Sequence, residues 1–117
     1  TGSGKTAAFL IPMVDHVLHK GVSLPVRRTL MPIAVIMAPT RELAAQIYDE
    51  GRKFTYRTGL RCVVVYGGAD SRHQMYELQR GANLVVATPG RLLEMFQRGL
   101  VSFSNIQYLV LDEADRM

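Results

Sequence analysis

The chain contains four short runs of mainly apolar residues. They span residues 33–38, 61–66, 84–87 and 108–111. Runs of this length that are apolar at consecutive positions, instead of at every second one, are typical of strands buried on both faces. We therefore expect four strands of a sheet that helices cover on both sides.

Segments with helical spacing lie between these runs. Predicted helices extend from 5 to about 19, from Thr40 through Leu43, Ala44, Ile47, Gly51 and Phe54, from 71 to about 80, and onward from Thr88-Pro89. Thr40 is a candidate N-cap, and Ser71 and Gln74 have the spacing of a capping box. Because strands and helices alternate, the sequence favours an α/β fold with a parallel sheet.

The domain organisation follows from the same pattern. The strand that should feed the first helix would lie upstream of Thr1, so the predicted sheet is short of a member. We expect residues 1–117 to form one partial α/β domain, truncated at both ends. No internal repeat interrupts the alternation.

The charge is positive and arginine-rich. The formal net charge is +4, and 11 of the 14 basic residues are Arg, the side chain best suited to bidentate contacts with phosphates. Three of the ten acids crowd the last six positions, so the rest of the chain is more basic still. A polyanionic partner is a reasonable expectation, and an ordinary basic surface remains the alternative.

The number of cysteines and the hydropathy of the chain bear on the cellular compartment. A lone Cys62 cannot form an internal disulfide and has no metal-ligand companions, which fits a core residue in a reducing compartment. The apolar runs are far shorter than a membrane span. We expect an intracellular protein without a membrane association, in the cytoplasm, with the nucleus and RNP granules left open.

The first six residues, TGSGKT, carry the pattern of a phosphate-binding loop. Such a loop needs glycines that let successive backbone N–H groups face one anion, a Lys as point charge and a hydroxyl for magnesium, all at a helix N-terminus. Gly2, Gly4, Lys5 and Thr6 supply these groups in order. The residue that would complete the pattern G-x-x-x-x-G-K-[ST] precedes Thr1.

An acidic cluster, DEAD (112–115), follows the last apolar run. An acid at the carboxyl end of such a strand is where a phosphate-loop enzyme holds its magnesium ion. Asp112 would hold Mg²⁺, through water, and Glu113 would orient and deprotonate the attacking water. A solvated loop is the alternative for the tetrapeptide alone, but TGSGKT at the other end of the chain makes that interpretation weak.

Two further strand ends resemble each other. Residues 38–41 (APTR) and 87–91 (ATPGR) each place a hydroxyl, backbone amides and an Arg at the first turn of a helix, which is anion-binding chemistry. A single nucleotide cannot occupy all these places, so they suggest a chain of phosphates such as a nucleic-acid strand. Each could also be a well-capped helix and nothing more. Gly67-Gly68, after another strand, could allow close backbone approach or form a tight turn.

At these places the chain resembles the DEAD-box family of ATP-dependent RNA helicases, within helicase superfamily 2. TGSGKT is similar to its motif I, PTRELA (39–44) to motif Ia, Gly67-Gly68 to the glycine doublet, TPGR (88–91) to motif Ib and DEAD (112–115) to motif II. The motifs keep their order over the whole chain. The stretches GRKFTYR, VVYGGAD and VLDEADRM are further similar to the Vasa/Belle-like branch.

The resemblance implies a RecA-like parallel sheet and a set of nucleotide-binding residues. ATP would be bound by Thr1, Gly2, Ser3, Gly4, Lys5 and Thr6, with Lys5 on the beta and gamma phosphates. Thr6 and Asp112 would hold Mg²⁺, and Glu113 would act as the catalytic base. Asp115 would link the nucleotide state to the other motifs.

RNA contacts are also implied by the resemblance. The sugar-phosphate backbone would be contacted by Thr40, Arg41, Gly68, Thr88, Gly90 and Arg91, without sequence preference. The intact protein would couple ATP hydrolysis to local duplex unwinding or RNP remodelling. A non-catalytic RNA clamp switched by ATP is the alternative, whereas PTRELA and TPGR together disfavour a DNA helicase or a phosphate-loop kinase.

This sequence differs from the family pattern in the motifs that it does not contain. The upstream glutamine motif that selects adenine, the Ser-Ala-Thr motif and the second RecA-like domain are absent from this sequence. ATP over GTP is therefore implied by the family alone. Because the second domain supplies the arginine fingers, we expect this chain by itself to have negligible ATPase and no unwinding activity.

Overall fold

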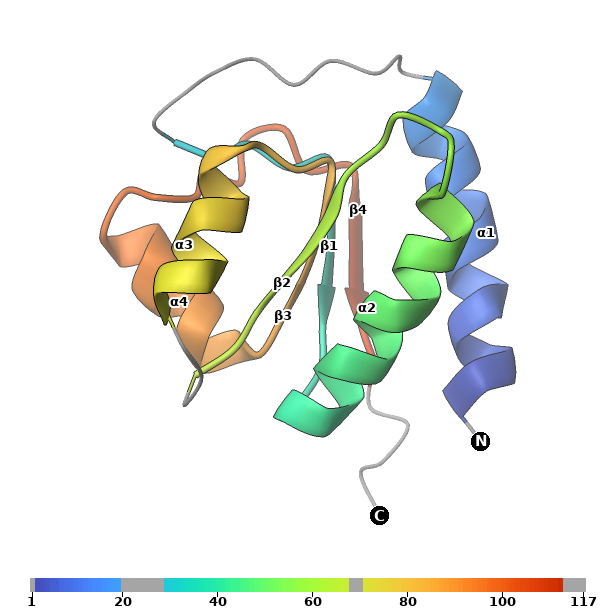
Figure 1. Ribbon diagram of the computed structural model, residues 1–117, viewed down its shortest axis with the longest axis horizontal. Coiled ribbons are helices and arrows are strands. Elements are labelled where there is room, and N and C mark those ends of the chain that lie inside the picture. The colour runs from blue at the N-terminus through green and yellow to red at the C-terminus, as the bar shows by residue number, and fades with distance from the viewer. Residues whose placement is uncertain (1, 20–28, 68–70, 113–117) are drawn as a thin grey trace.

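Four parallel strands form one sheet with helices on both faces (Figure 1). The computed structural model describes residues 2–19, 29–67 and 71–112. The strands are β1 (Ala34–Met37), β2 (Cys62–Val65), β3 (Leu84–Ala87) and β4 (Tyr108–Leu111), in the order β2-β3-β1-β4. Every pair is parallel and in register, so the carboxyl ends of all four strands lie at one edge. The predicted parallel sheet is confirmed.

The helices divide into two layers. They are α1 (Gly2–His19), α2 (Arg41–Thr55), α3 (Ser71–Gln79) and α4 (Pro89–Gln97). The buried side chains of α1 and α2 pack with Ile36 and Val86 on one face of the sheet, and those of α3 and α4 pack with Val35 and Val85 on the other. Alternate residues of one strand therefore enter different cores, which explains why the strands are apolar throughout.

Helix α1 begins at Gly2, three residues before the predicted start at Lys5. Gly2, Ser3 and Gly4 thus belong to the first helical turn and not to a preceding loop. Apolar spacing could not locate this boundary, because none of the three carries an apolar side chain that marks a helix face. The first turn contains no acidic residue, so nothing there opposes an anion at the helix N-terminus.

Strand β4 departs from the expectation of a sheet covered on both faces. Leu109 and Leu111 are 57% and 59% exposed, whereas every residue of β3 is buried. In the described part of the chain β4 pairs only with β1. The buried side chains of α4 belong to a core cluster with residues of β1, β2 and β3. An apolar run predicts a strand but does not say how many of its neighbours are present.

The expected capping box at Ser71 and Gln74 is not formed by Gln74. Its side-chain amide instead contacts the backbone of Tyr66: Oε1 accepts from the Tyr66 N–H and Nε2 donates to the Tyr66 carbonyl, both at 3.0 Å. Gln74 is only 6% exposed. It satisfies polar groups at the end of β2 rather than at the start of its own helix.

The turns that lead from helices back into strands lie at the amino edge of the sheet. They contain the residues with left-handed backbone angles: Arg57, Gly59, Gly81 and Gly99. Glycine after a helix adopts this conformation without the steric cost that a side chain would bring. The strained turns and the candidate site therefore occupy opposite edges of the sheet.

Candidate functional site

Backbone hydrogen bonds join the ends of the four strands at the carboxyl edge. The Ala38 N–H donates to the Ala87 carbonyl at 2.9 Å, and the Thr88 N–H donates to the Val65 carbonyl at 3.1 Å. The Asp112 N–H donates to the Met37 carbonyl at 2.8 Å. The parallel register thus brings the β1–α2 junction, the β3–α4 junction and Asp112 to one edge, as the sequence predicts.

The β1–α2 junction is a capped helix start. Thr40 has extended backbone angles, and its Oγ1 accepts from the Leu43 N–H at 3.1 Å, which confirms the predicted N-cap. The exposed Arg41 places its guanidinium carbon 5.6 Å from the centre of the Tyr66 ring, within the range of a cation–π contact. Tyr66 follows β2, so this contact joins the β1 and β2 ends.

The β3–α4 junction is arranged differently. Thr88 precedes Pro89, the first residue of α4, but the Thr88 hydroxyl makes no capping hydrogen bond. The Arg91 side chain is 8% exposed, and its Nη1 donates to Oε1 of Glu94 at 2.8 Å. Its Nε and Nη2 are buried without a hydrogen-bond partner in the described part of the chain. Two nitrogens of this buried cation therefore have no hydrogen-bond acceptor among the described residues.

Glycine at position 90 leaves room at this junction. A Cβ built on Gly90 would meet no atom within 4 Å, so the residue is not required by packing inside the chain. An absent side chain at the first turn of a helix lets another molecule approach the backbone closely. This fits the prediction that Gly90 contacts a ligand through its backbone.

Helix α1 runs alongside β4 in the opposite direction. Near the end of α1, His16 Nε2 donates to Oε1 of Gln107 at 2.8 Å, and the His16 ring meets the Tyr108 ring edge-on at 4.8 Å. From His16 back to Lys5 a helix covers about 16 Å. From Tyr108 to Asp112 a strand covers about 13 Å. The start of α1 and Asp112 should therefore lie at a similar height along the strand direction. Figure 1 shows the beginning of α1 and the end of β4 at the same end of the sheet.

The donor set at this end fits magnesium held together with phosphates. Asp112 is 7% exposed and directly follows β4, and carboxylate oxygen is the ligand type that Mg²⁺ prefers. Among the described residues no three His, Cys, Asp or Glu side chains could hold an ion together. Mg²⁺ usually takes only one or two carboxylates in addition to substrate phosphates and water, so this arrangement suits it.

Several predicted site residues lie outside the described residues: Thr1, Gly68, Glu113 and Asp115. For Gly2, Ser3, Gly4, Lys5 and Thr6 the structure describes the backbone as the first turn of α1, and the side chains of Ser3, Lys5 and Thr6 lie outside the description. The roles assigned to these residues stay predictions.

Glu94 was missed by sequence reasoning. It bonds Arg91 and is three residues further along α4, the spacing at which oppositely charged side chains meet on a helix. That spacing was available as a signal in the sequence. The burial of Arg91 was not, because it depends on the neighbouring elements.

The two groups with shifted pKa values lie where α2 packs against β2, away from Asp112 and from the β3–α4 junction. Burial raises the pKa of the Cys62 thiol to about 12, although part of the residue is exposed. Desolvation by burial also raises the pKa of the Tyr48 phenol, and Arg52 opposes this shift. A thiol that stays protonated at neutral pH is not a nucleophile, so Cys62 is a packing residue.

Known proteins are similar to this chain in fold and in sequence. A sequence model of the DEAD/DEAH box helicase family matches residues 1–117. The structure is similar to that of the RNA helicase Prp28 from Chaetomium thermophilum bound to ADP, with 44% identity and a TM-score of 0.82. It is also similar to the yeast DEAD-box splicing factor Prp28, at 38% and 0.78, and to a hypothetical ATP-dependent RNA helicase from Sulfolobus tokodaii, at 33% and 0.79.

Each similarity covers 100% of this chain and a minor part of the other protein, namely 28%, 27% and 31%. The four-stranded parallel sheet with its two helical layers is thus part of a RecA-like helicase domain. Among the described residues, none of the helices has the length and apolar character needed to span a bilayer. With the family match over residues 1–117, this chain belongs to the DEAD/DEAH box helicase family.

Proposed function

We propose that the protein containing this chain is an ATP-dependent RNA helicase that couples ATP hydrolysis to local duplex unwinding or RNP remodelling. One observation carries the proposal: the register places the β1–α2 junction, the β3–α4 junction and Asp112 on one edge of the sheet. Family membership and the similarity to proteins described as RNA helicases, one of them bound to ADP, support it.

ATP binding is assigned to the start of α1. The first four N–H groups of a helix have no intrahelical acceptor and attract phosphate, and in α1 these belong to Gly2, Ser3, Gly4 and Lys5. We assign ATP to Thr1, Gly2, Ser3, Gly4, Lys5 and Thr6, a sequence that also contains a cation and hydroxyls. Thr6 and Asp112 would hold Mg²⁺, which when bound neutralises charge that develops on the transferring phosphoryl group. Lys5 would bind the beta and gamma phosphates.

Hydrolysis is assigned to the acidic cluster after β4. Glu113 would orient and deprotonate the attacking water, next to the Asp112 carboxylate. Asp115 would pass the state of the nucleotide site to the rest of the protein. The direction of α1 relative to β4 supports this assignment, because it brings the two halves of the site toward the same level.

RNA binding is assigned to the two junctions and to Gly68. The Thr40 hydroxyl accepts a hydrogen bond inside α2 but keeps its own proton for a phosphate oxygen. Thr88 and the two available donors of Arg91 would bind further phosphates, with Gly90 allowing close approach and Arg41 adding charge. Such contacts read no base edges, so binding would be independent of sequence.

The test uses the intact protein and two substitutions. Lys5→Ala should weaken nucleotide binding, whereas Glu113→Gln should preserve binding and stop RNA-stimulated hydrolysis, because only the second removes a group needed at the attacking water. Nucleotide affinity and ATPase turnover with and without RNA are the measurements. Equal loss of nucleotide affinity in both variants contradicts the assigned roles, and stimulation by DNA as strong as by RNA contradicts the substrate.

A comparison of nucleotides separates unwinding from clamping. Duplex release over many turnovers with ATP, and not with a non-hydrolysable analogue, supports the helicase. A single release that the analogue supports equally well identifies an ATP-switched clamp instead. We also propose that this chain alone hydrolyses ATP negligibly, since arginine fingers contribute about 10³- to 10⁵-fold in related chemistry. RNA-stimulated turnover by the purified 117-residue chain contradicts this.

Two finer assignments rest on sequence alone. We propose membership of the Vasa/Belle-like branch from the stretches GRKFTYR, VVYGGAD and VLDEADRM. Comparison of the full parent sequence with members of that branch and with the Prp28 proteins tests it. We propose an intracellular location from the single cysteine, and localisation of the tagged parent protein tests it.

A further inference from the structure

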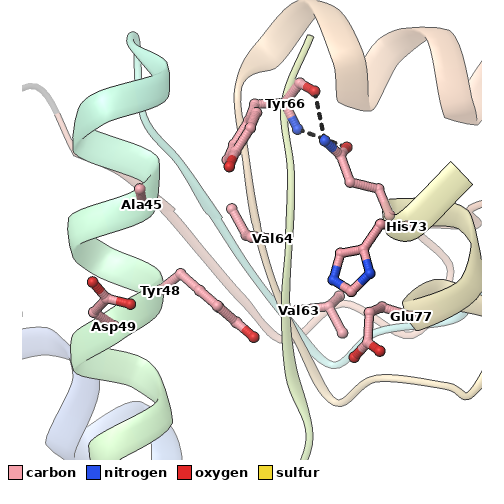
Figure 2. Close-up of a pocket in the computed structure, with 9 residues that line it drawn as sticks. Ala45, Tyr48, Asp49, Val63, Val64, Tyr66, His73 and Glu77 are labelled. Atoms are coloured by element: carbon pink, nitrogen blue, oxygen red, sulfur yellow. Dashed lines mark hydrogen bonds between the residues drawn. The ribbon is translucent and has the colours of Figure 1, made fainter. Parts of the chain in front are cut away.

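The free edge of β2 forms one wall of a cavity of about 610 Å³ between α2 and α3. Figure 2 shows Tyr48 reaching toward β2 from α2, with His73 and Glu77 on the α3 side. The lining consists of Ala45, Tyr48, Asp49, Val63, Val64, Tyr66, His73, Gln74 and Glu77. None of the residues assigned to ATP or RNA lines this cavity.

Alternate residues of β2 direct their backbone N–H and C=O groups toward this cavity. The carbonyls of Arg61 and Val65 accept hydrogen bonds from residues of the β3 side. The odd-numbered residues of β2 therefore direct their backbone groups toward β3. Cys62, Val64 and Tyr66 therefore direct their N–H and C=O groups to the open edge. An edge of this kind is a template on which another extended chain can pair.

One position on this edge already has a substitute for a neighbouring strand. The side-chain amide of Gln74 binds both the N–H and the C=O of Tyr66, at 3.0 Å each, as the backbone of an added strand would (Figure 2, dashed lines). The next outward residue is Val64, which lines the cavity. In the described part of the chain, the side chains of α2 and α3 do not bond its backbone groups, so an added strand would find them available.

The charge of the lining selects the occupant. Among the described lining residues there are two carboxylates and neither Lys nor Arg, although the chain carries a net charge of +4. Glu77 is already engaged by Arg61 at 3.1 Å and Arg80 at 3.7 Å. Asp49 is exposed and forms no ion pair with any described residue, so it can receive a cation from outside.

We propose that the β2 edge binds an extended, basic segment of a protein partner by strand addition. Backbone groups of the segment pair with Val64. Side chains on one side lie over Ala45, beside the Tyr48 ring that Arg52 contacts, and a Lys or Arg side chain reaches Asp49. The cavity adjoins the β1–α2 junction, because Arg41 contacts the ring of Tyr66, which is one of the lining residues.

A display library of random eight-residue peptides, selected on the full chain, is the probe. The expected result is enrichment of peptides that alternate β-branched or aromatic residues with Lys or Arg. For a selected peptide, methylation of backbone nitrogens one at a time should abolish binding at alternate positions only, because only every second N–H of an extended chain faces the β2 edge. This readout does not alter the protein, so misfolding cannot produce it.

Two substitutions locate the site. Asp49→Asn should weaken binding about two- to fivefold and reduce its salt dependence, as expected for an exposed ion pair. The matched control is Glu50→Gln, which removes the same charge from the adjacent residue of α2, outside the cavity lining. Val64→Pro removes the outward N–H and should abolish binding, since Pro is tolerated on an edge strand when its nitrogen faces away from the ladder.

Three outcomes overturn the proposal: no peptide is enriched, acidic peptides are enriched, or the selected peptides show no alternation on N-methylation. Equal effects of Asp49→Asn and Glu50→Gln also overturn it, because the charge at the cavity would then be irrelevant. Asp49→Asn should leave RNA affinity of the intact protein unchanged.

Discussion

The β1–α2 and β3–α4 junctions contain the same kinds of residue, Thr, Pro and Arg, and each begins a helix at the carboxyl edge. In the first, the Thr40 hydroxyl caps its helix and Arg41 is exposed beside the Tyr66 ring. In the second, the Thr88 hydroxyl caps nothing and Arg91 is turned inward with two donors available. Equal composition therefore does not mean equal roles: the first junction serves the fold and a ligand, whereas the second has more groups free for a ligand.

The largest expected difference between the junctions concerns the two arginines. In the intact protein, Arg91→Met should lower RNA affinity about tenfold and the salt slope by about 0.7, the value for one phosphate contact on a single strand. Arg41→Met should cost about threefold, because an exposed cation in high dielectric contributes less. Titration of a labelled RNA at several salt concentrations measures both. A larger loss for Arg41 would show that the β1–α2 junction, and not the β3–α4 junction, contributes more to RNA binding.

The second difference concerns the two threonines. Thr40→Ala should lower the free energy of unfolding by about 1 kcal/mol, since it removes the hydrogen bond to the Leu43 N–H. Thr88→Ala should change it by less than about 0.5 kcal/mol, because no cap is lost. Urea unfolding of the two variants beside the unmodified chain gives the values. Similar losses in both would show that Thr88 also caps its helix.

The third difference concerns glycines in the two helices. A Cβ at Gly51 of α2 would lie 3.0 Å from the Cys62 Sγ, whereas a Cβ at Gly90 of α4 meets nothing within 4 Å. Gly51→Ala should destabilise by about 1 kcal/mol, as overpacking against the sulfur exceeds the gain in helix propensity. Adding Cys62→Ala should recover part of that loss.

Gly90→Ala is the counterpart on α4. It should leave the free energy of unfolding within about 0.5 kcal/mol of the unmodified value but lower the RNA affinity of the intact protein, because the new methyl group occupies space that only a ligand would enter. The same urea and RNA titrations apply. Unchanged RNA affinity in Gly90→Ala would remove this residue from the proposed interface.

The sequence predicts the parallel sheet, all four helices and the Thr40 cap, because these depend on apolar periodicity and on local capping chemistry. It does not predict the inward turn of Arg91 or the bonds from Gln74 to Tyr66, since both depend on how a helix lies against a neighbouring element. The exposed faces of Leu109 and Leu111 were missed for the same reason. Types of residue at the site could be predicted, whereas which of their polar groups remain available could not.

A further prediction concerns the pH dependence of stability on the α2 side. The pKa of the Cys62 thiol is raised to about 12 in the folded chain from an ordinary 9.0, so the unfolded chain loses this proton first as pH rises. The stabilisation is fully present below pH 9 and is lost between about pH 9 and 12, and the raised pKa of Tyr48 acts in the same direction. Unfolding curves from pH 7 to 11 test this. Stability that rises over that interval would contradict the burial of the thiol.

Cys62, whose raised pKa keeps the thiol protonated at neutral pH, is the chain's only cysteine, and this has a practical consequence for spectroscopy. A second cysteine placed at an exposed position on the amino edge, such as Arg98→Cys, should react with a maleimide dye at neutral pH while the native sulfur stays unlabelled. A single-molecule fluorescence reporter could then be attached on the side of the sheet opposite the strand tips. The native cysteine would not need to be removed first.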